Sequence, residues 1–185
     1  PASVQPFDWD PRCSPSDLAS RVPPLDMKEP ILTGHKGFRV RGPNVRTSNE
    51  DEATVRRAQI PDLWKRYLEA GGPQSISGGL DAPVTIAVYT HYESDHTGMY
   101  TLVVGAPLVT AEGTKKLEHK TCEIPDGSYL LFEGGGSMPK ALIDTWQRIY
   151  AYFDGDVPYQ RTYEADFEVH DGSSPDHVEV YVGVR

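Results

Sequence analysis

An internal repeat constrains the fold of this sequence more than any other feature. Residues 60–67 read IPDLWKRY and residues 142–149 read LIDTWQRI, so an apolar residue, Asp, Trp and Arg recur in the same order about 80 residues apart. Two copies of one helical segment predict two copies of the structural unit around it.

The strands that follow the two helices repeat as well. Tyr89-Thr90-His91 matches Glu168-Val169-His170, and the runs TLVVG and EVYVG end the two copies. A helix followed by two strands therefore occurs twice. We expect an α+β domain of two pseudo-twofold-related β-α-β-β units, with an antiparallel sheet, helices on one face and a ligand cleft on the other.

The organisation along the chain follows from composition and periodicity. Residues 1–27 are rich in Pro, Ser and Asp without periodicity and predict an irregular N-terminal extension. Residues 28–185 form one predicted domain, with an internal repeat at 28–110 and 111–185, and residues 47–54 predict a polar loop. The predicted strands cover residues 31–40, 84–92, 99–104, 116–124, 128–132, 163–170 and 177–184, and the predicted helices cover residues 61–70 and 138–153.

The bulk properties exclude several classes of function. The 185 residues carry a formal net charge of −9, which argues against direct binding of nucleic acid. No apolar run approaches the length of a membrane span, and no signal peptide is visible, so we expect a cytoplasmic protein that binds no membrane. Cys13 and Cys122 show no metal-ligand spacing. We therefore expect no cofactor. We also expect a monomer or weak dimer.

Alternation along the strands predicts which side chains face the cleft. Every second residue from Val178 to Val184 is Val, so this apolar face should pack against the helices. The same reasoning turns Phe167, Ile86 and Val88 toward the helices. The residues expected on the opposite, cleft-bearing face are Tyr89, His91, Glu168, His170 and Tyr181.

A carboxylate among aromatic rings is typical of a site for a lipophilic cation. Burying an unpaired Glu is costly unless a positive charge compensates it, and aromatic rings add cation–π attraction. Glu168 is the strongest candidate, although an exposed strand Glu is the structural alternative, and the apolar helix stripes also suit Trp64 and Trp146 as core residues. The full set of candidate ligand-binding residues is Glu168, His170, Tyr181, Tyr89, His91, Phe132, Trp64, Trp146 and Tyr150.

A metal site and a phosphate loop are weaker interpretations. His91, Glu93, Asp95 and His96 are possible ligands, but the last two lie in a turn before a glycine, and a structural turn is favoured. No metal is expected. The glycine run at 134–136 lacks the Gly-Lys-Ser/Thr ending of a phosphate loop and predicts flexibility at the mouth of the cleft.

The sequence also resembles a known family, the GyrI-like, AraC-type effector-binding domains, and above all their stand-alone, integron-associated branch. The resemblance covers about residues 29–185. The stretches that carry it are Phe38–Val40, Val45–Asn49, Tyr89–Asp95, Gly98–Gly105, Tyr159–Val169 and Val178–Val184.

The resemblance implies a twofold-repeated α+β domain that binds lipophilic, often cationic, drugs or metabolites. Glu168 matches the acidic residue at the floor of the family's pocket, and Tyr181 matches a tyrosine that often faces it. His170 stands where the family commonly has an aromatic or aliphatic residue. A protonated imidazole there would pair with Glu168 and weaken cation binding at low pH. A regulatory role would require a separate DNA-binding partner.

A second hypothesis belongs to a different class of function. Some members of the superfamily resemble cofactor-free hydrolases that open strained electrophiles such as cyclopropane-bearing toxins. In that case Glu168 would serve as base and Tyr181 or Tyr89 as acid, with His170 as an alternative base. The spacing of these residues suits both hypotheses.

Overall fold

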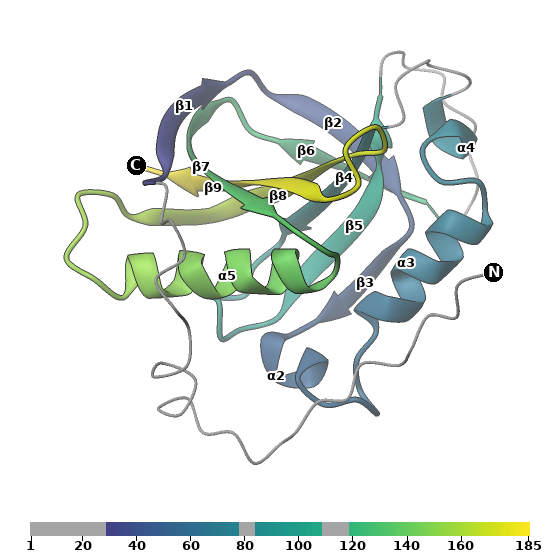
Figure 1. Cartoon of the computed structure of the whole chain (residues 1–185), viewed down its shortest axis with the longest axis horizontal. Coiled ribbons are helices and arrows are strands. Elements are labelled where there is room, and N and C mark those ends of the chain that lie inside the picture. The colour runs from purple at the N-terminus through teal and green to yellow at the C-terminus, as the bar shows by residue number, and fades with distance from the viewer. Residues whose placement is uncertain (1–28, 78–83, 109–118) are drawn as a thin grey trace.

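The computed structural model describes residues 29–77, 84–108 and 119–185, so the predicted extension at 1–27 lies outside the described residues. The chain alternates between strands and helices in the order shown in Figure 1. The elements are β1 (Ile31–His35), β2 (Phe38–Gly42), β3 (Asn44–Thr47), α2 (Asn49–Glu52), α3 (Ile60–Glu69), α4 (Gln74–Ser77), β4 (Val84–Thr90), β5 (Tyr100–Pro107), β6 (Lys120–Ile124), β7 (Gly127–Gly135), α5 (Lys140–Phe153), β8 (Arg161–Asp171) and β9 (His177–Val184).

The strands form one antiparallel sheet with a twofold-repeated order. Strand order is β1-β7-β9-β8-β4-β5-β2-β6, and β3 also pairs with β5. One unit is β3-α3-β4-β5 with strand order β3-β5-β4, and the other is β7-α5-β8-β9 with strand order β7-β9-β8. The units meet where β4 pairs with β8. The predicted α+β fold of two β-α-β-β units is confirmed.

The register of β4 against β8 defines which residues of the two units are equivalent. Val88 lies opposite Phe167 near the middle of this antiparallel pair. A local twofold axis through that pair relates residues at equal offsets along the two strands. Tyr89 is therefore equivalent to Glu168, as the sequence match predicts.

The two long helices form where the repeated segments predict them. In α3, Pro61 occupies the first turn, and Leu63 and Tyr67 are buried at the spacing of one helical face. In α5, Ala141, Thr145 and Ile149 are buried with the same periodicity. Through these buried faces, α3 packs against β5 and β3, and α5 packs against β7 and β9.

Both faces of the central strands are buried, and this overturns the predicted orientation of the strands. One face carries Ala87 and Tyr89 against α3, while the other packs Val88 and Phe167 against residues of β2 and β6. In Figure 1, β1, β2 and β6 lie on the side of the central strands away from α5. Since side chains on both faces of β8 are buried, alternation alone does not indicate which side the helices cover.

The valines of β9 do face α5, as predicted, but Glu168 is on their side of the sheet. Glu168 pairs across the ladder with Val180, and both side chains lie on the face that the helices cover. The prediction that Glu168 and Tyr89 face away from the helices is therefore wrong. The candidate site lies between the sheet and the helices.

Two further boundaries differ from prediction. The segment expected as one strand over 31–40 is two strands, because β1 pairs with β7 whereas β2 pairs with β5 and β6. The polar segment 47–54 contains the short helix α2. Ser48 caps this helix by accepting a hydrogen bond from the Asp51 backbone N–H at 3.2 Å.

Candidate functional site

Glu168 is a fully buried carboxylate in the middle of β8. Its Oε1 accepts hydrogen bonds from the Tyr89 hydroxyl at 2.6 Å and from the Trp146 indole N–H at 2.7 Å. Its Oε2 lies 2.8 Å from Nε2 of His170. An indole nitrogen only donates, so Oε1 is an acceptor, and the arrangement suits an ionised carboxylate.

Aromatic side chains from both units enclose this carboxylate. The ring of Tyr89 lies 4.9 Å from Trp146, and the ring of Trp64 lies 4.9 Å from His170, both edge-on. Tyr150 lies 5.9 Å from Trp146 on α5. The repeat-equivalent tryptophans, Trp64 of α3 and Trp146 of α5, therefore both belong to the site.

The hydroxyls around Glu168 are held as neutral donors. Burial, and next the charge of Glu168, raise the pKa of Tyr89 well above its ordinary value. Burial also raises the pKa of Tyr150. Both phenols therefore stay protonated at neutral pH, and the negative charge of the cluster resides on Glu168.

A second buried carboxylate lies two residues away on the same face of β8. Asp166 accepts hydrogen bonds at Oδ2 from Arg161 at 2.5 Å and from the Tyr92 hydroxyl at 2.7 Å. Its Oδ1 accepts from the backbone N–H of Gly183 at 2.9 Å. The guanidinium of Arg161 lies over the ring of Tyr163, at 4.4 Å. Asp166 is thus neutralised by a permanent cation, whereas Glu168 is not.

Polar groups at one end of the site form a network that sequence reasoning missed. The Asn49 amide donates to the backbone carbonyl of His96 at 2.8 Å and to the Tyr150 hydroxyl at 3.1 Å. Its Oδ1 accepts from the Tyr100 hydroxyl at 3.1 Å. Asn49 is about 100 residues from Tyr150 in the sequence, and no local pattern connects the two.

Six predicted residues gather at the site, and three do not. Glu168, His170, Tyr89, Trp64, Trp146 and Tyr150 lie together.

Tyr181 is on the opposite face of the sheet. It stacks on Phe167 with ring centroids 4.6 Å apart and donates to Glu179 at 2.7 Å. The prediction that it faces Glu168 is wrong, because adjacent β8 and β9 residues in register share a face and Tyr181 pairs with Phe167.

His91 and Phe132 are also outside the cluster. His91 is exposed just after β4, where its backbone turns to φ 53°, so its side chain does not continue the face of Tyr89. Its carbonyl accepts from Arg46. Phe132 is a core residue under α5, in contact with Tyr152. The structure therefore does not bring either residue to the Glu168 cluster, because the backbone turn after β4 and burial under α5 are tertiary properties that no local pattern indicates.

The segment considered as a metal site is a turn. Asp95 accepts from the backbone and hydroxyl of Thr97, and Glu93 accepts from the backbone of Met99. Within residues 29–77, 84–108 and 119–185, no group of three or more His, Cys, Asp or Glu side chains is arranged to hold a metal ion. In the same part of the chain, no helix is long and apolar enough to span a membrane.

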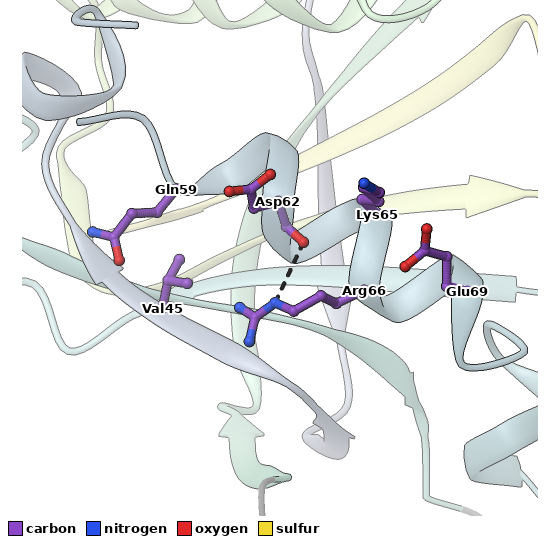
Figure 2. A pocket seen from close by; sticks show the side chains of 6 residues that line it. All are labelled: Val45, Gln59, Asp62, Lys65, Arg66 and Glu69. Atoms are coloured by element: carbon purple, nitrogen blue, oxygen red, sulfur yellow. Dashed lines mark hydrogen bonds between the residues drawn. The ribbon is translucent and has the colours of Figure 1, made fainter. Parts of the chain in front are cut away.

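A surface hollow of about 320 Å³ lies beside α3, away from the Glu168 cluster. Figure 2 shows its polar lining, with the Arg66 side chain donating to the carbonyl of Asp62. The lining residues are Val45, Gln59, Asp62, Lys65, Arg66 and Glu69. These charged side chains suit a solvated groove, so the enclosed aromatic cluster is the better candidate for a lipophilic ligand.

The fold and the enclosed acidic, aromatic cluster define an effector-binding type of α+β domain. Residues 32–184 match the family model described as Cass2, integron-associated effector binding protein. The chain therefore belongs to this family of effector-binding proteins.

Individual relatives agree with this assignment. The chain is 27% identical over 152 residues to the putative transcriptional regulator protein YobU of Bacillus subtilis. The aligned region covers 80% of this chain and 92% of YobU. It is 30% identical to the integron cassette protein VCH_CASS2 of Vibrio cholerae, with a TM-score of 0.73 over 86% of this chain and 97% of that chain. SAV2435, solved bound to tetraphenylphosphonium, shares the fold at 18% identity, with a TM-score of 0.63 over 85% of this chain and 94% of that chain.

Proposed function

We propose that this domain binds a lipophilic cation at Glu168, between the tryptophans of α3 and α5. The observation that carries the proposal is the charge balance of the site. Glu168 is fully buried, and the three groups bound to it among the described residues are a phenol, an indole and an imidazole. None of them carries a permanent positive charge.

The energetics favour a cationic ligand over a neutral one. A buried carboxylate without a counter-charge is costly even when it is hydrogen-bonded, and a bound cation compensates it. Each aromatic ring facing the cation adds roughly 0.5–2 kcal/mol. A micromolar ligand needs about −8 kcal/mol, which one ion pair, two or three rings and apolar burial supply together.

Ligand entry requires Trp146 to move. Its indole N–H lies on Glu168 Oε1, and its ring lies against Tyr89. A bound cation replaces the indole as the partner of the carboxylate, and the displaced indole becomes one wall of the site. Binding should therefore change tryptophan fluorescence.

The comparisons support the chemistry of this ligand. The family is one of effector-binding proteins, and SAV2435, which shares the fold, is a structure bound to a tetraphenylphosphonium cation. The proposed ligand of this chain belongs to the same class, a bulky apolar cation.

The test is calorimetric titration with tetraphenylphosphonium, with neutral triphenylphosphine oxide as the matched probe. Wild-type protein should bind the cation in preference to the neutral probe, and Glu168→Gln should lose about tenfold or more in affinity for the cation alone. Glu179→Gln is the matched control, because Glu179 also accepts from a tyrosine but lies on the opposite face of the sheet. Equal cation binding by wild type and Glu168→Gln would refute the role of Glu168.

Only some of the residues that the hydrolase hypothesis requires lie together in the structure. Tyr181 lies on the other face, which leaves Glu168, Tyr89 and His170. The hydroxyl proton of Tyr89 is directed at Glu168, which is an orientation for holding a carboxylate and not for protonating a leaving group. Incubation with a cyclopropane-bearing electrophile should show no turnover that depends on Glu168; turnover lost in Glu168→Gln would favour the hydrolase.

A regulatory role, as distinct from sequestration, depends on a separate partner. YobU is named a putative transcriptional regulator, but the net charge of −9 of this chain disfavours direct contact with DNA. We therefore place any regulation in a second protein that reads the ligand-bound state. Co-purification with a DNA-binding protein only in the presence of tetraphenylphosphonium would support this arrangement.

A further inference from the structure

The hydrogen bonds of Asn49 fix the direction of its side-chain amide. The carbonyl of His96 only accepts, so the Asn49 nitrogen must face it, at 2.8 Å. The same nitrogen donates to the Tyr150 oxygen at 3.1 Å, and the Asn49 oxygen accepts from Tyr100 at 3.1 Å. Both ends of the amide are used, and exchanging its oxygen and nitrogen would place two oxygens against each other at His96.

This fixed amide orients the hydroxyl of Tyr150. Because Asn49 donates to the Tyr150 oxygen, the hydroxyl proton of Tyr150 points away from Asn49. The described residues supply no hydrogen-bond acceptor for that proton. Tyr150 is half-buried, so its unused donor lies at the edge of the enclosed cluster.

The position of Tyr150 places this donor beside the proposed cation site. It follows Trp146 by one helical turn of α5, with the two rings 5.9 Å apart. Trp146 itself donates to Glu168 at 2.7 Å, so the ring of Tyr150 lies beside a residue that binds the carboxylate.

We infer that Tyr150 determines ligand specificity by donating a hydrogen bond to an uncharged acceptor on the ligand. This inference rests on the proposed function, because the cationic centre lies over Glu168 and the acceptor lies toward Tyr150. The ligand class is therefore a lipophilic cation that also carries a carbonyl or ether oxygen on the side that faces Tyr150.

Two cations of nearly equal shape test this inference. Tetraphenylphosphonium has no acceptor, and (4-acetylphenyl)triphenylphosphonium adds one ketone oxygen. Wild-type protein should bind the acetyl compound about 3–10-fold more tightly, the range of one neutral hydrogen bond. Tyr150→Phe keeps the aromatic ring and should abolish this preference, so that the two cations bind the variant equally well.

Two further variants separate the hydroxyl from general effects on α5. Tyr152→Phe makes the same chemical change on the same helix, where the ring packs against Phe132 and Phe153, and it should keep the preference. Asn49→Asp keeps the Tyr150 hydroxyl but offers it an acceptor, so the preference should fall even though the hydroxyl is present. Thermal unfolding of each variant checks that it is folded.

The outcomes distinguish this inference from the proposed function. If Tyr150→Phe keeps the preference, or if wild type shows none, while Glu168→Gln still weakens both cations, then Tyr150 does not determine specificity and the cation site stands. If wild type binds neither cation, both the inference and the proposed function are wrong.

Discussion

At the scale of single residues, two carboxylates on one strand face have different roles because their partners differ. Asp166 and Glu168 are both fully buried, two residues apart on β8. Asp166 has a guanidinium, Arg161, as its counter-ion, and Glu168 has only neutral donors and the titratable imidazole of His170. The first carboxylate is neutralised within the protein, whereas the second is the one that we propose binds a cationic ligand.

The buried pair predicts a large loss of stability on truncation. Arg161→Met leaves Asp166 as an unpaired buried charge and should lower the free energy of unfolding by about 3–5 kcal/mol. The exposed pair of Lys140 and Asp144 provides a control, since Lys140→Met should cost no more than about 1 kcal/mol. Urea denaturation measures both. Adding Asp166→Asn to Arg161→Met should recover part of the loss; no recovery would mean that lost packing, and not the unpaired charge, dominates.

The contact of His170 with Glu168 predicts competition for the carboxylate. Nε2 of His170 lies 2.8 Å from Glu168 Oε2, so a bound cation must share or replace this partner. His170→Phe keeps an aromatic ring against Trp64 but removes the competing nitrogen, so tetraphenylphosphonium should bind several-fold more tightly. Calorimetric titration measures the affinity. His177→Phe, a control near Glu179, should behave as wild type; the same gain there would exclude His170 as the cause.

At the scale of elements, the close approach of α5 to β7 positions Trp146 over Glu168. Within the glycine run at 134–136, which the sequence predicts as a flexible connection, Gly134 allows this close packing. A Cβ on Gly134 would lie 2.2 Å from Thr145 Oγ1, so the hydroxyl of a buried helix residue occupies the place of the missing side chain. Thr145 also donates to the carbonyl of Ala141 at 2.8 Å, which fixes its rotamer.

This contact predicts different effects on stability for alanine substitutions at two neighbouring glycines. Gly134→Ala should destabilise the domain by about 1–3 kcal/mol, because Thr145 or the helix must shift. It should also weaken tetraphenylphosphonium binding, since Trp146 follows Thr145 on α5. Gly135→Ala should change little, as the nearest atom to its added Cβ is 3.9 Å away. Thermal unfolding and titration of both variants test this; equal effects would mean that backbone freedom, and not space, requires glycine at 134.

At the scale of the whole molecule, the two units share a fold but contribute differently to the site. Equivalent positions hold Tyr89 in one unit and Glu168 in the other, and these two side chains bond directly across the junction of β4 and β8. The equivalent tryptophans flank the pair. A twofold-repeated fold thereby produces a site with one charge, which suits a ligand with one charge.

Much of this arrangement is predictable from the sequence, for physical reasons that also explain the failures. The repeat predicts the units, and the match of Tyr89 with Glu168 predicts the residues at their junction. Strand alternation does not predict the face, because Phe167 and Val88 are as buried as the valines of β9. Tyr181 is misplaced for that reason. Arg161 reaches Asp166 only through a shift of register between β8 and β9, which no local pattern indicates.

The number of buried phenols predicts that the whole domain loses stability in alkaline solution. Burial raises the pKa of Tyr67 to about 12 and that of Tyr129 to about 12, against an ordinary value near 10. Below about pH 10 both the folded and the unfolded chain hold these phenol protons, so the phenols do not reduce the free energy of unfolding. Between about pH 10 and 12 only the unfolded chain releases them, and the free energy of unfolding therefore falls as the pH rises. Urea denaturation at about pH 8.5 and about pH 11 should show this fall. The free energy of unfolding of the Tyr67→Phe variant should fall less between these two pH values than that of wild type, because the variant has one phenol fewer to ionise on unfolding. An equal fall in wild type and Tyr67→Phe would show that Tyr67 makes no contribution to the alkaline loss.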